Sequence, residues 1–350
     1  MDNTNIFYHA PKELTTDAFW IWLLYFIDSD DNYEYAKQLI FNSLILKDCD
    51  KGRRVTNISV NRQQKCSHGR IDFIFHFTFT DDNSTHSVLF EDKTWSNTST
   101  EQLTGYKEDY PCLYRYCYYK LGYTNIQELK IVTGCGYDII TAKMMSDCLA
   151  RFKDLHILIK YYYDYIKETF TDYIDSFESE LFIKNNFDLL WEAQAQLFLA
   201  DKLWYALPKT IRNNCYIQNG TSSGRPWTEI VLIDDEHITS DYQESIFWRI
   251  DIRSGKFYIR LNQYSWYVDD ENNTIWKKKQ ARLSSLREVG DYILKTYPIH
   301  LKKGKPTDRG CFEQEIVIFF LEENNWDSIF KDIPVFTQLF INIYKSQTEY

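Results

Sequence analysis

Two acidic side chains, a lysine and a glutamine lie within one short part of the sequence, residues 72–102. Asp72 is in the segment IDFIFHFTF, Glu91 and Lys93 are in VLFEDKT, and Gln102 is in TSTEQLTGY. Paired carboxylates are hard oxygen ligands of the kind that bind Mg²⁺ together with a substrate phosphate. A metal held there would activate a water, and the lysine would orient that water or neutralise charge that develops on phosphorus. These residue types therefore point to phosphodiester hydrolysis.

Alternating apolar and polar residues predict the strands that would carry these side chains. Residues 71–79 and 86–94 alternate with a period of two, and the polar stretch DDNSTH is typical of a turn. The two strands would form a hairpin, and Asp72, Glu91 and Lys93 would lie at its open end.

A four-residue loop, DDNS, predicts how the two strands of this hairpin pair. Asp72 would then lie opposite Lys93, and Ile74 opposite Glu91. Every register in which paired residue numbers add to an odd sum places Asp72, Glu91 and Lys93 on one face. Asp92, between Glu91 and Lys93, would point to the opposite face.

A helix is predicted to begin soon after the second strand. Thr98 followed by Glu101 is the capping-box pattern found at helix starts. Gln102 would lie in the first turn of this helix, on the side that faces back to Lys93.

Periodicity predicts the remaining elements of the first half. These are helices over 12–27 and 33–46, a strand over 129–134 and a helical region over 141–171. In the first helix, Glu13 and Asp17 lie four residues apart and share one side. The resulting fold class is α/β (α+β), with helices packed on a mixed sheet.

The second half is predicted to form a separate α+β domain. Its elements are a helix over 185–207, strands over 227–233, 245–252, 256–264 and 315–320, a basic helix around 284–294 and a terminal helix. The boundary falls between 172 and 188, which gives domains 1–180 and 181–350.

The composition favours a folded protein without a membrane segment. A net charge of −10 argues against a protein that coats nucleic acid, because phosphate binding depends on Lys and Arg. The longest apolar run, AFWIWLLYFI, is too short to span a bilayer, which favours a cytoplasmic location. The eight cysteines form no CxxC pair, so reduced thiols are expected rather than a zinc site.

Two basic segments stand out against this acidic background. Residues 50–70 hold six basic side chains and one acidic one, and residues 276–309 hold ten and three. The residues predicted to bind substrate are Arg70, Lys277, Lys278 and Lys279. The alternative is that both segments are solvated faces of the protein.

The order of Asp72, Glu91-x-Lys93 and Gln102, with an acid-bearing helix in front, resembles the PD-(D/E)XK nuclease superfamily. The segments KELTTDAFWIWLL and KYYYDYI resemble bacterial and phage members of it. The resemblance covers about residues 5–170. The segment before Asp72 reads HGRID and lacks the superfamily's proline.

The resemblance implies an αβββαβ core, like that of restriction endonucleases, and a Mg²⁺ or Mn²⁺ cofactor. Asp72 and Glu91 would be metal ligands, and the backbone carbonyl of Asp92 would be a third. Lys93 would orient the attacking water, and Gln102 would assist at the phosphate or at the water. Glu13 would supply the first-helix acid, with Asp17 as the alternative.

The sequence thus predicts a metal-dependent nuclease that hydrolyses DNA, with RNA a less favoured substrate. By analogy with the family, it would act in defence against foreign DNA or mobile elements. Cutting both strands of a duplex needs two sites, which is compatible with a homodimer. The alternative function is a catalytically silent nuclease fold that binds nucleic acid or protein.

Overall fold

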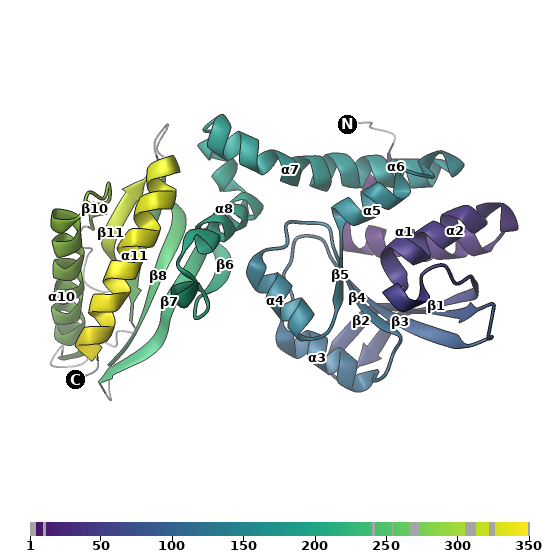
Figure 1. The fold of residues 1–350 in the computed structure, drawn as a ribbon, viewed down its shortest axis with the longest axis horizontal. Helices are drawn as coiled ribbons and strands as arrows, with labels where there is room; N and C mark the ends of the chain where they lie inside the picture. Colours follow the sequence, from purple (N-terminus) through teal and green to yellow (C-terminus); the bar gives the residue numbers. More distant parts are fainter. Residues whose placement is uncertain are drawn as a thin grey trace. The chain divides into compact units, whose positions relative to one another are not determined.

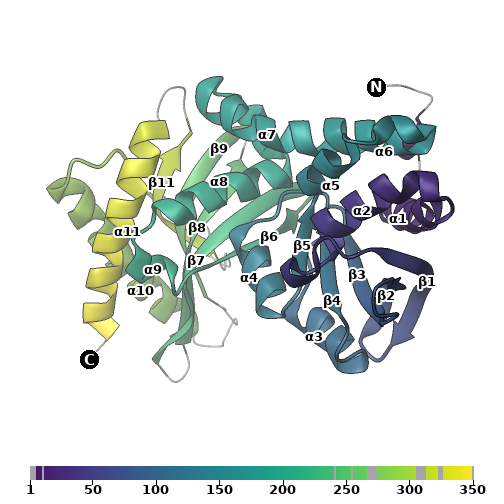
Figure 2. The same cartoon turned by 45° about the vertical axis from the view of Figure 1, so that its right-hand side comes forward.

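The chain forms two units, residues 1–176 and 177–350, each built on its own sheet (Figure 1, Figure 2). The structure, a computed structural model, describes residues 5–9, 12–239, 242–253, 255–265, 274–304, 313–321 and 326–348. Residues 1–176 are called the N-terminal unit, and residues 177–350 are called the C-terminal unit.

The N-terminal unit is α+β with a five-stranded mixed sheet. Its helices are α1 (Lys12–Asp28), α2 (Glu34–Ile40), α3 (Thr100–Asp109), α4 (Ile126–Gly134), α5 (Ala142–Leu149) and α6 (Ile157–Ile166), and α7 (Asp172–Glu178) follows them. Its strands are β1 (Val55–Cys66), β2 (Gly69–Phe79), β3 (Thr85–Lys93), β4 (Arg115–Lys120) and β5 (Asp138–Thr141), in that spatial order. The first three strands pair antiparallel, and β4 and β5 run parallel to β3. The predicted mixed sheet is confirmed.

Helices cover both faces of this sheet, so two cores form. One core joins α1, α5 and α6 to the sheet through residues such as Trp20, Phe75 and Tyr162. The other joins α3 and α4 through residues such as Leu103 and Val132. Figure 2 shows α1 and α6 on one side of the sheet and α3 and α4 on the other.

The predicted register of the β2–β3 hairpin was wrong by two residues. Thr78 lies opposite Thr85 and Phe73 opposite Phe90, so the loop is longer than the four residues expected. The loop is stabilised locally, because Asp82 accepts a hydrogen bond from the backbone N–H of Ser84 at 2.8 Å. The numbers of paired residues still add to an odd sum, because a shift of two residues leaves each side chain on the face predicted for it.

Strict alternation along β2 also fails at its open end. Ile71 lies in the core with α3 and α4, although Phe73 lies in the opposite core. On the neighbouring strand, Gln63 has a left-handed φ of 44° between the pairs Arg62–Phe73 and Gln64–Ile71. The pairing of β1 with β2 is therefore irregular beside Asp72.

The predicted strand over 129–134 was also wrong, because these residues form the end of α4. Asn125 caps this helix by accepting hydrogen bonds from the backbone N–H groups of Gln127 and Glu128. The position in the sheet that was expected for residues 129–134 is occupied by β4, whose sequence RYCYYK was not predicted as a strand. The helical region expected over 141–171 is divided, with α5 ending at Leu149 and α6 starting at Ile157.

The C-terminal unit carries a six-stranded antiparallel sheet in the order β10-β11-β9-β8-β7-β6. The strands are β6 (Tyr216–Ser222), β7 (Arg225–Thr239), β8 (Tyr242–Arg253), β9 (Lys256–Tyr264), β10 (Lys302–Lys303) and β11 (Glu313–Phe320). The helices are α8 (Ala193–Ala206), α9 (Lys209–Arg212), α10 (Thr274–Thr296) and α11 (Trp326–Thr348). The four predicted strands and the basic helix are confirmed.

Long helices pack on one face of this second sheet. The indole N–H of Trp248 in β8 donates to Thr337 Oγ1 in α11 at 2.8 Å, which joins the sheet to that helix. Across the described parts of both units, no helix combines the length and the apolar character that crossing a bilayer requires.

Candidate active site at the open end of the β2–β3 hairpin

Glu91, Lys93 and Gln102 meet where β3 ends. The ammonium of Lys93 contacts Glu91 Oε1, and Gln102 Nε2 donates to the same oxygen at 2.9 Å. Glu91 is 1% exposed, whereas the side chain of Lys93 keeps 14% of its surface. The structure therefore brings together three of the side chains that the sequence pattern predicted.

Helix α3 positions Gln102 through its first turn. The helix is capped by Ser99, not by Thr98 as predicted, and Ser99 Oγ accepts from the backbone N–H of Gln102 at 3.2 Å. Thr98 Oγ1 instead donates to the side-chain oxygen of Gln102 at 3.1 Å. Gln102 Nε2 also donates to Tyr106 Oη at 2.8 Å. The amide orientation is thus determined by partners at both of its ends.

Tyr106 and Gly105 hold α3 close to the β1–β2 hairpin. Tyr106 Oη donates to the backbone carbonyl of Arg70 at 3.0 Å. A Cβ added at Gly105 would lie 2.2 Å from the ring of His68, so only glycine permits this approach. The distance between α3 and the sheet depends on this contact.

Asp72 lies at the edge of a cavity next to these residues. Its Oδ2 accepts a hydrogen bond from the backbone N–H of Asp92 at 2.7 Å. The cavity has a volume of about 230 Å³, and Asp17, Arg62, Gln63 and Asp72 are among its lining residues. This cavity gives solvent access to Asp72, whereas Glu91 is buried and is not among the residues that line it.

The carboxyl of Glu91 has a strongly raised pKa. Burial and then the charge of Asp72 raise its pKa to about 8, although Lys93 acts in the opposite direction. Among the described residues, its buried Oε2 has no hydrogen-bond partner. A buried carboxylate oxygen without a donor is an open position for a proton or a cation.

The charges around Glu91 fit a divalent cation. Asp72 and Asp17 both raise the pKa of Glu91, so three carboxylates act on one another while Lys93 supplies one positive charge. Within the described residues, no three acidic, His or Cys side chains are already grouped as a metal cluster. Asp72 and Glu91 are the pair that would hold a metal, with main-chain oxygens and waters completing its shell.

The side chain of Asp92 cannot share that metal. It is 2% exposed. Burial, with the charge of Asp92 as a smaller cause, raises the pKa of Tyr119, Tyr162 and Tyr165, which lie in the core with α1 and α6. Glu91 instead acts on Tyr106 and other residues of the opposite core. Only the backbone of Asp92 faces the carboxylate pair.

The first-helix acid is represented by Asp17. The side chain of Glu13 lies outside the described residues, so its predicted role stays a prediction. Asp17 is 8% exposed and lines the same cavity as Asp72. The alternative named from the sequence is therefore the acid that the structure places beside the site.

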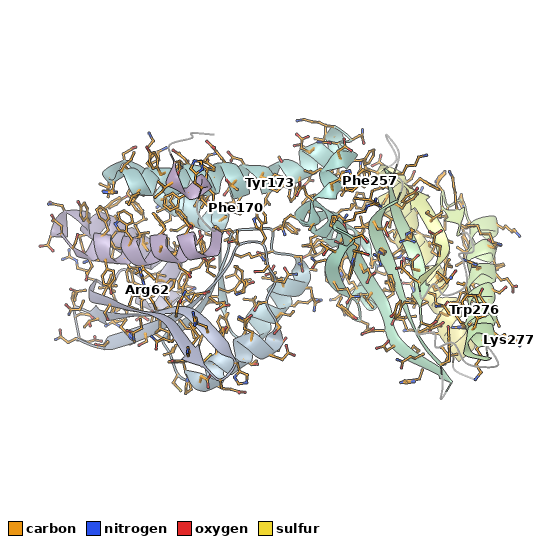
Figure 3. All side chains as sticks on the ribbon, turned by 180° about the vertical axis from the view of Figure 1, so that it is seen from behind. Arg62, Phe170, Tyr173, Phe257, Trp276 and Lys277 are labelled. Atoms are coloured by element: carbon orange, nitrogen blue, oxygen red, sulfur yellow. The ribbon has the colours of Figure 1, made fainter. Side chains whose placement is uncertain are left out.

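The predicted substrate-binding lysines differ in exposure. Lys277 and Lys278 are exposed on α10, and Figure 3 marks Lys277 on the C-terminal unit. Lys279 is fully buried, and its ammonium donates to the carbonyl of Ser265 at 3.0 Å. The prediction that Lys279 binds substrate is wrong, because its charge does not reach the surface. Arg70 is exposed and donates to Gln63 Oε1 at 3.0 Å.

A second buried ion pair next to the site was not predicted. Lys120 is 0% exposed, lies opposite Lys93 in the parallel β3–β4 ladder and contacts Glu128 Oε1 at 2.9 Å. Its ammonium also donates at 2.5 Å to the carbonyl of Ser96, in the segment between Lys93 and α3. Tyr118 completes the cluster by donating to Glu128 at 2.6 Å. A prediction of β4 would have placed Lys120 beside Lys93.

Comparison with known proteins identifies no family. No protein-family model matches the sequence, and no curated protein matches it. Among solved structures, the chain is similar to the MspJI restriction endonuclease in complex with a 27-mer oligonucleotide, with 13% identity and a TM-score of 0.27. The alignment covers 45% of this chain and 36% of that chain. A TM-score this low does not establish a shared fold, so any function must be argued from the geometry described above.

Proposed function

We propose that this protein is a metal-dependent nuclease that hydrolyses phosphodiester bonds of DNA at the open end of the β2–β3 hairpin. The observation that carries the proposal is Glu91, a buried carboxylate with one oxygen held by Lys93 and Gln102 and the other without a partner among the described residues. The order α1, α2, β1, β2, β3, α3, β4 supports the restriction-endonuclease-like αβββαβ core that the sequence resemblance implies, with α2 as an additional helix.

Asp72 and Glu91 would hold Mg²⁺ or Mn²⁺. Such an ion supplies Lewis-acid stabilisation of the phosphoryl oxygens and an acidified water. Oε2 of Glu91 would be the oxygen offered to the ion, and Lys93, which contacts the other oxygen, would orient the attacking water. Gln102 would keep Glu91 oriented, since its own amide is fixed by Thr98 and Tyr106.

Arg62 is the group that would bind the substrate backbone next to these carboxylates. It lines the same cavity as Asp72, it is exposed, and its side chain makes no hydrogen bond or ion pair with another described residue. Figure 3 marks Arg62 on the N-terminal unit. A guanidinium binds phosphate oxygens in a bidentate manner, and it would draw the scissile phosphate toward an otherwise acidic site.

The test is a cleavage assay with supercoiled plasmid, single-stranded DNA and RNA in the presence of Mg²⁺ or Mn²⁺. Lys93→Ala should abolish cleavage, because the water and the developing charge lose their cationic partner. Lys160→Ala is the matched control, since Lys160 is exposed on α6. Full activity of Lys93→Ala would contradict the proposal.

Absence of cleavage by the wild type would favour the rival function, a silent nuclease fold used for binding. An inactive wild type could also be a nuclease that needs a partner before it cleaves. Calorimetric titration of Mg²⁺ or Mn²⁺ distinguishes such a nuclease from a silent binding fold. A nuclease awaiting a partner should still bind metal and lose that binding in Glu91→Ala. A silent binding module should bind metal in neither form.

A further inference from the structure

The C-terminal unit carries a network of charged side chains on the face of its sheet opposite Trp248. Arg249 in β8 contacts Glu313 at 2.7 Å and Glu229 at 3.1 Å. Arg260 in β9 contacts Asp251 at 2.5 Å and Glu315 at 3.0 Å. Both arginines point away from the helices, because their neighbours along each strand alternate between the two faces.

Burying the charges of this network costs desolvation free energy. Arg260 is 1% exposed and Glu229 is 4% exposed, and taking paired charges out of water usually gains little stability. Burial raises the pKa of Glu229. The network holds its side chains in fixed positions, which is what a preformed binding site requires.

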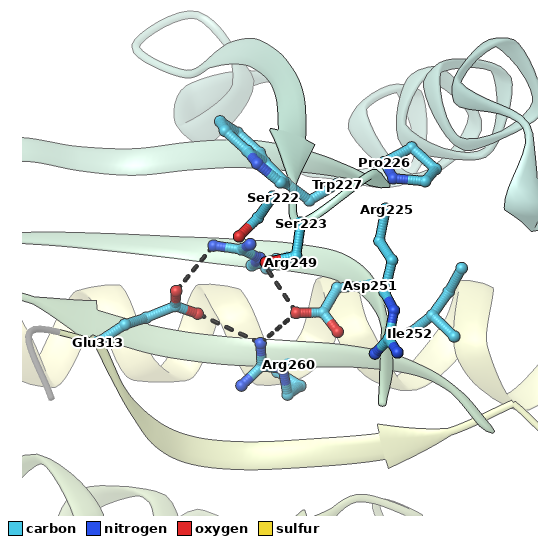
Figure 4. A pocket seen from close by; sticks show the side chains of 10 residues that line it. All are labelled: Ser222, Ser223, Arg225, Pro226, Trp227, Arg249, Asp251, Ile252, Arg260 and Glu313. Carbon is cyan, nitrogen blue, oxygen red and sulfur yellow. Dashed lines mark hydrogen bonds and ion pairs between the residues drawn. The ribbon is translucent and has the colours of Figure 1, made fainter. Parts of the chain in front are cut away.

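A pocket of about 320 Å³ opens beside the network (Figure 4). Its walls include Trp227, Arg249 and Arg260, and its mouth carries Ser222 and Arg225. This volume lies within the range of small-molecule sites, whose walls combine apolar surface with a few fixed polar groups.

Two buried polar atoms of this pocket have neither a hydrogen-bond partner nor an ion-pair partner among the described residues. They are Oδ1 of Asp251, which is 8% exposed, and Nε of Arg260. The other oxygen of Asp251 is used by the arginines, as the dashed lines in Figure 4 show. Buried polar atoms are normally satisfied, so these two are an acceptor and a donor for a ligand.

The mouth of the pocket adds groups suited to an anion. Arg225 is exposed and makes no hydrogen bond or ion pair with any other described residue, and in Figure 4 its side chain runs toward Asp251 and Ile252. The neighbouring hydroxyls of Ser222 and Ser223 are likewise exposed. Arg249 and Arg260 are already paired with Glu229, Glu313, Asp251 and Glu315, so Arg225 is the arginine of this lining whose charge is open to an anion.

We propose that this pocket binds a nucleotide unit, that is, a phosphate attached to a nucleoside. The phosphate would lie at Arg225, Ser222 and Ser223. The nucleoside would donate a hydrogen bond to Asp251 Oδ1 and accept one from Arg260 Nε, beside the apolar surfaces of Trp227 and Ile252. Such a unit is available both as a free mononucleotide and within a nucleic-acid strand.

The test is calorimetry on the full chain in EDTA, so it does not depend on metal or on cleavage. The probes are the ribonucleoside and deoxyribonucleoside monophosphates, a six-nucleotide single strand and inorganic phosphate. At least one nucleotide probe should bind at a single site. Binding by mononucleotides assigns a free ligand, and binding by the hexanucleotide alone assigns a strand.

Arg225→Gln should weaken that binding by roughly tenfold or more, because a charge-assisted contact to phosphate is lost. Ser222→Trp should block it by filling the mouth. Lys209→Gln, a charge change on α9 away from the pocket, should leave it unchanged. The proposal is overturned if no nucleotide probe binds, if inorganic phosphate binds as tightly as the nucleotides, or if Arg225→Gln has no effect.

Discussion

Asp72 accepts a hydrogen bond from the backbone N–H of Asp92, with a distance of 2.7 Å between Oδ2 and N. This bond joins the two strands beyond Phe73 and Phe90, the last pair of the β2–β3 ladder at this end. The position of the Asp72 carboxylate is therefore determined by the main chain, before any cation is bound.

Asp72→Asn should remove the negative charge of this residue and keep its hydrogen bond to the backbone of Asp92. The amide oxygen still accepts from the backbone of Asp92, so the fold should be kept, while the negative charge is lost. Affinity for Mg²⁺ should fall by at least the roughly 10–100-fold seen when an outer partner of a metal site is removed. Calorimetric titration measures this, and undiminished metal binding would rule out Asp72 as a ligand.

The stability of the metal-free protein should fall as the pH rises toward 8. Glu91 has a pKa of about 8 in the folded protein against an ordinary value of 4.5. Between these values the folded state keeps a proton that the unfolded chain has lost, so the free energy of unfolding decreases with rising pH. The change should be on the order of a few kcal/mol.

Glu91→Gln is the control for this pH dependence, because its side chain is neutral throughout. Urea unfolding in EDTA between about pH 5 and pH 8 should show a flatter profile for Glu91→Gln than for the wild type. Parallel profiles would mean that Glu91 is already ionised in the metal-free protein.

Lys120→Met should be strongly destabilising. It leaves the buried carboxylate of Glu128 without its cation, and such uncompensated charges cost about 3–5 kcal/mol. The double variant Lys120→Met with Glu128→Gln should recover most of the loss, since no buried charge remains. Denaturant unfolding gives both values. A double variant no more stable than the single one would show that Lys120 acts mainly by holding the carbonyl of Ser96.

Arg62→Gln should weaken DNA binding and make it less sensitive to salt. Each phosphate contact contributes about 0.7–0.9 to the slope of log K against log salt concentration. Arg54→Gln is the matched control, because it removes the same charge near the other end of β1. Fluorescence anisotropy in EDTA measures both slopes. Equal slopes for the two variants would contradict the role of Arg62.

Local sequence patterns predicted those parts of the site that depend on periodicity. Alternation along β3 was sufficient to bring Glu91 and Lys93 together, because residues two apart in a strand point to the same face. The polar run before the helix was sufficient to place Gln102, although Ser99 rather than Thr98 is the cap.

Contacts between distant segments were not predictable in this way. The sequence RYCYYK lacks clear alternation because β4 is buried on both faces between parallel neighbours. Without β4, nothing in the sequence relates Lys120 to Lys93. The left-handed Gln63, which breaks the ladder beside Asp72, is likewise determined by its tertiary surroundings.

The irregular backbone of β1 has a consequence for how copies of this protein can associate. This strand is an edge of the mixed sheet, and it has positive φ angles at Asn57 and Gln63 and exposed charges at Arg62 and Lys65. Kinks and charges of this kind prevent an edge from recruiting a strand of another chain, and the opposite edge, β5, has only four residues. Neither edge is therefore a template for aggregation or for a sheet continued across two molecules.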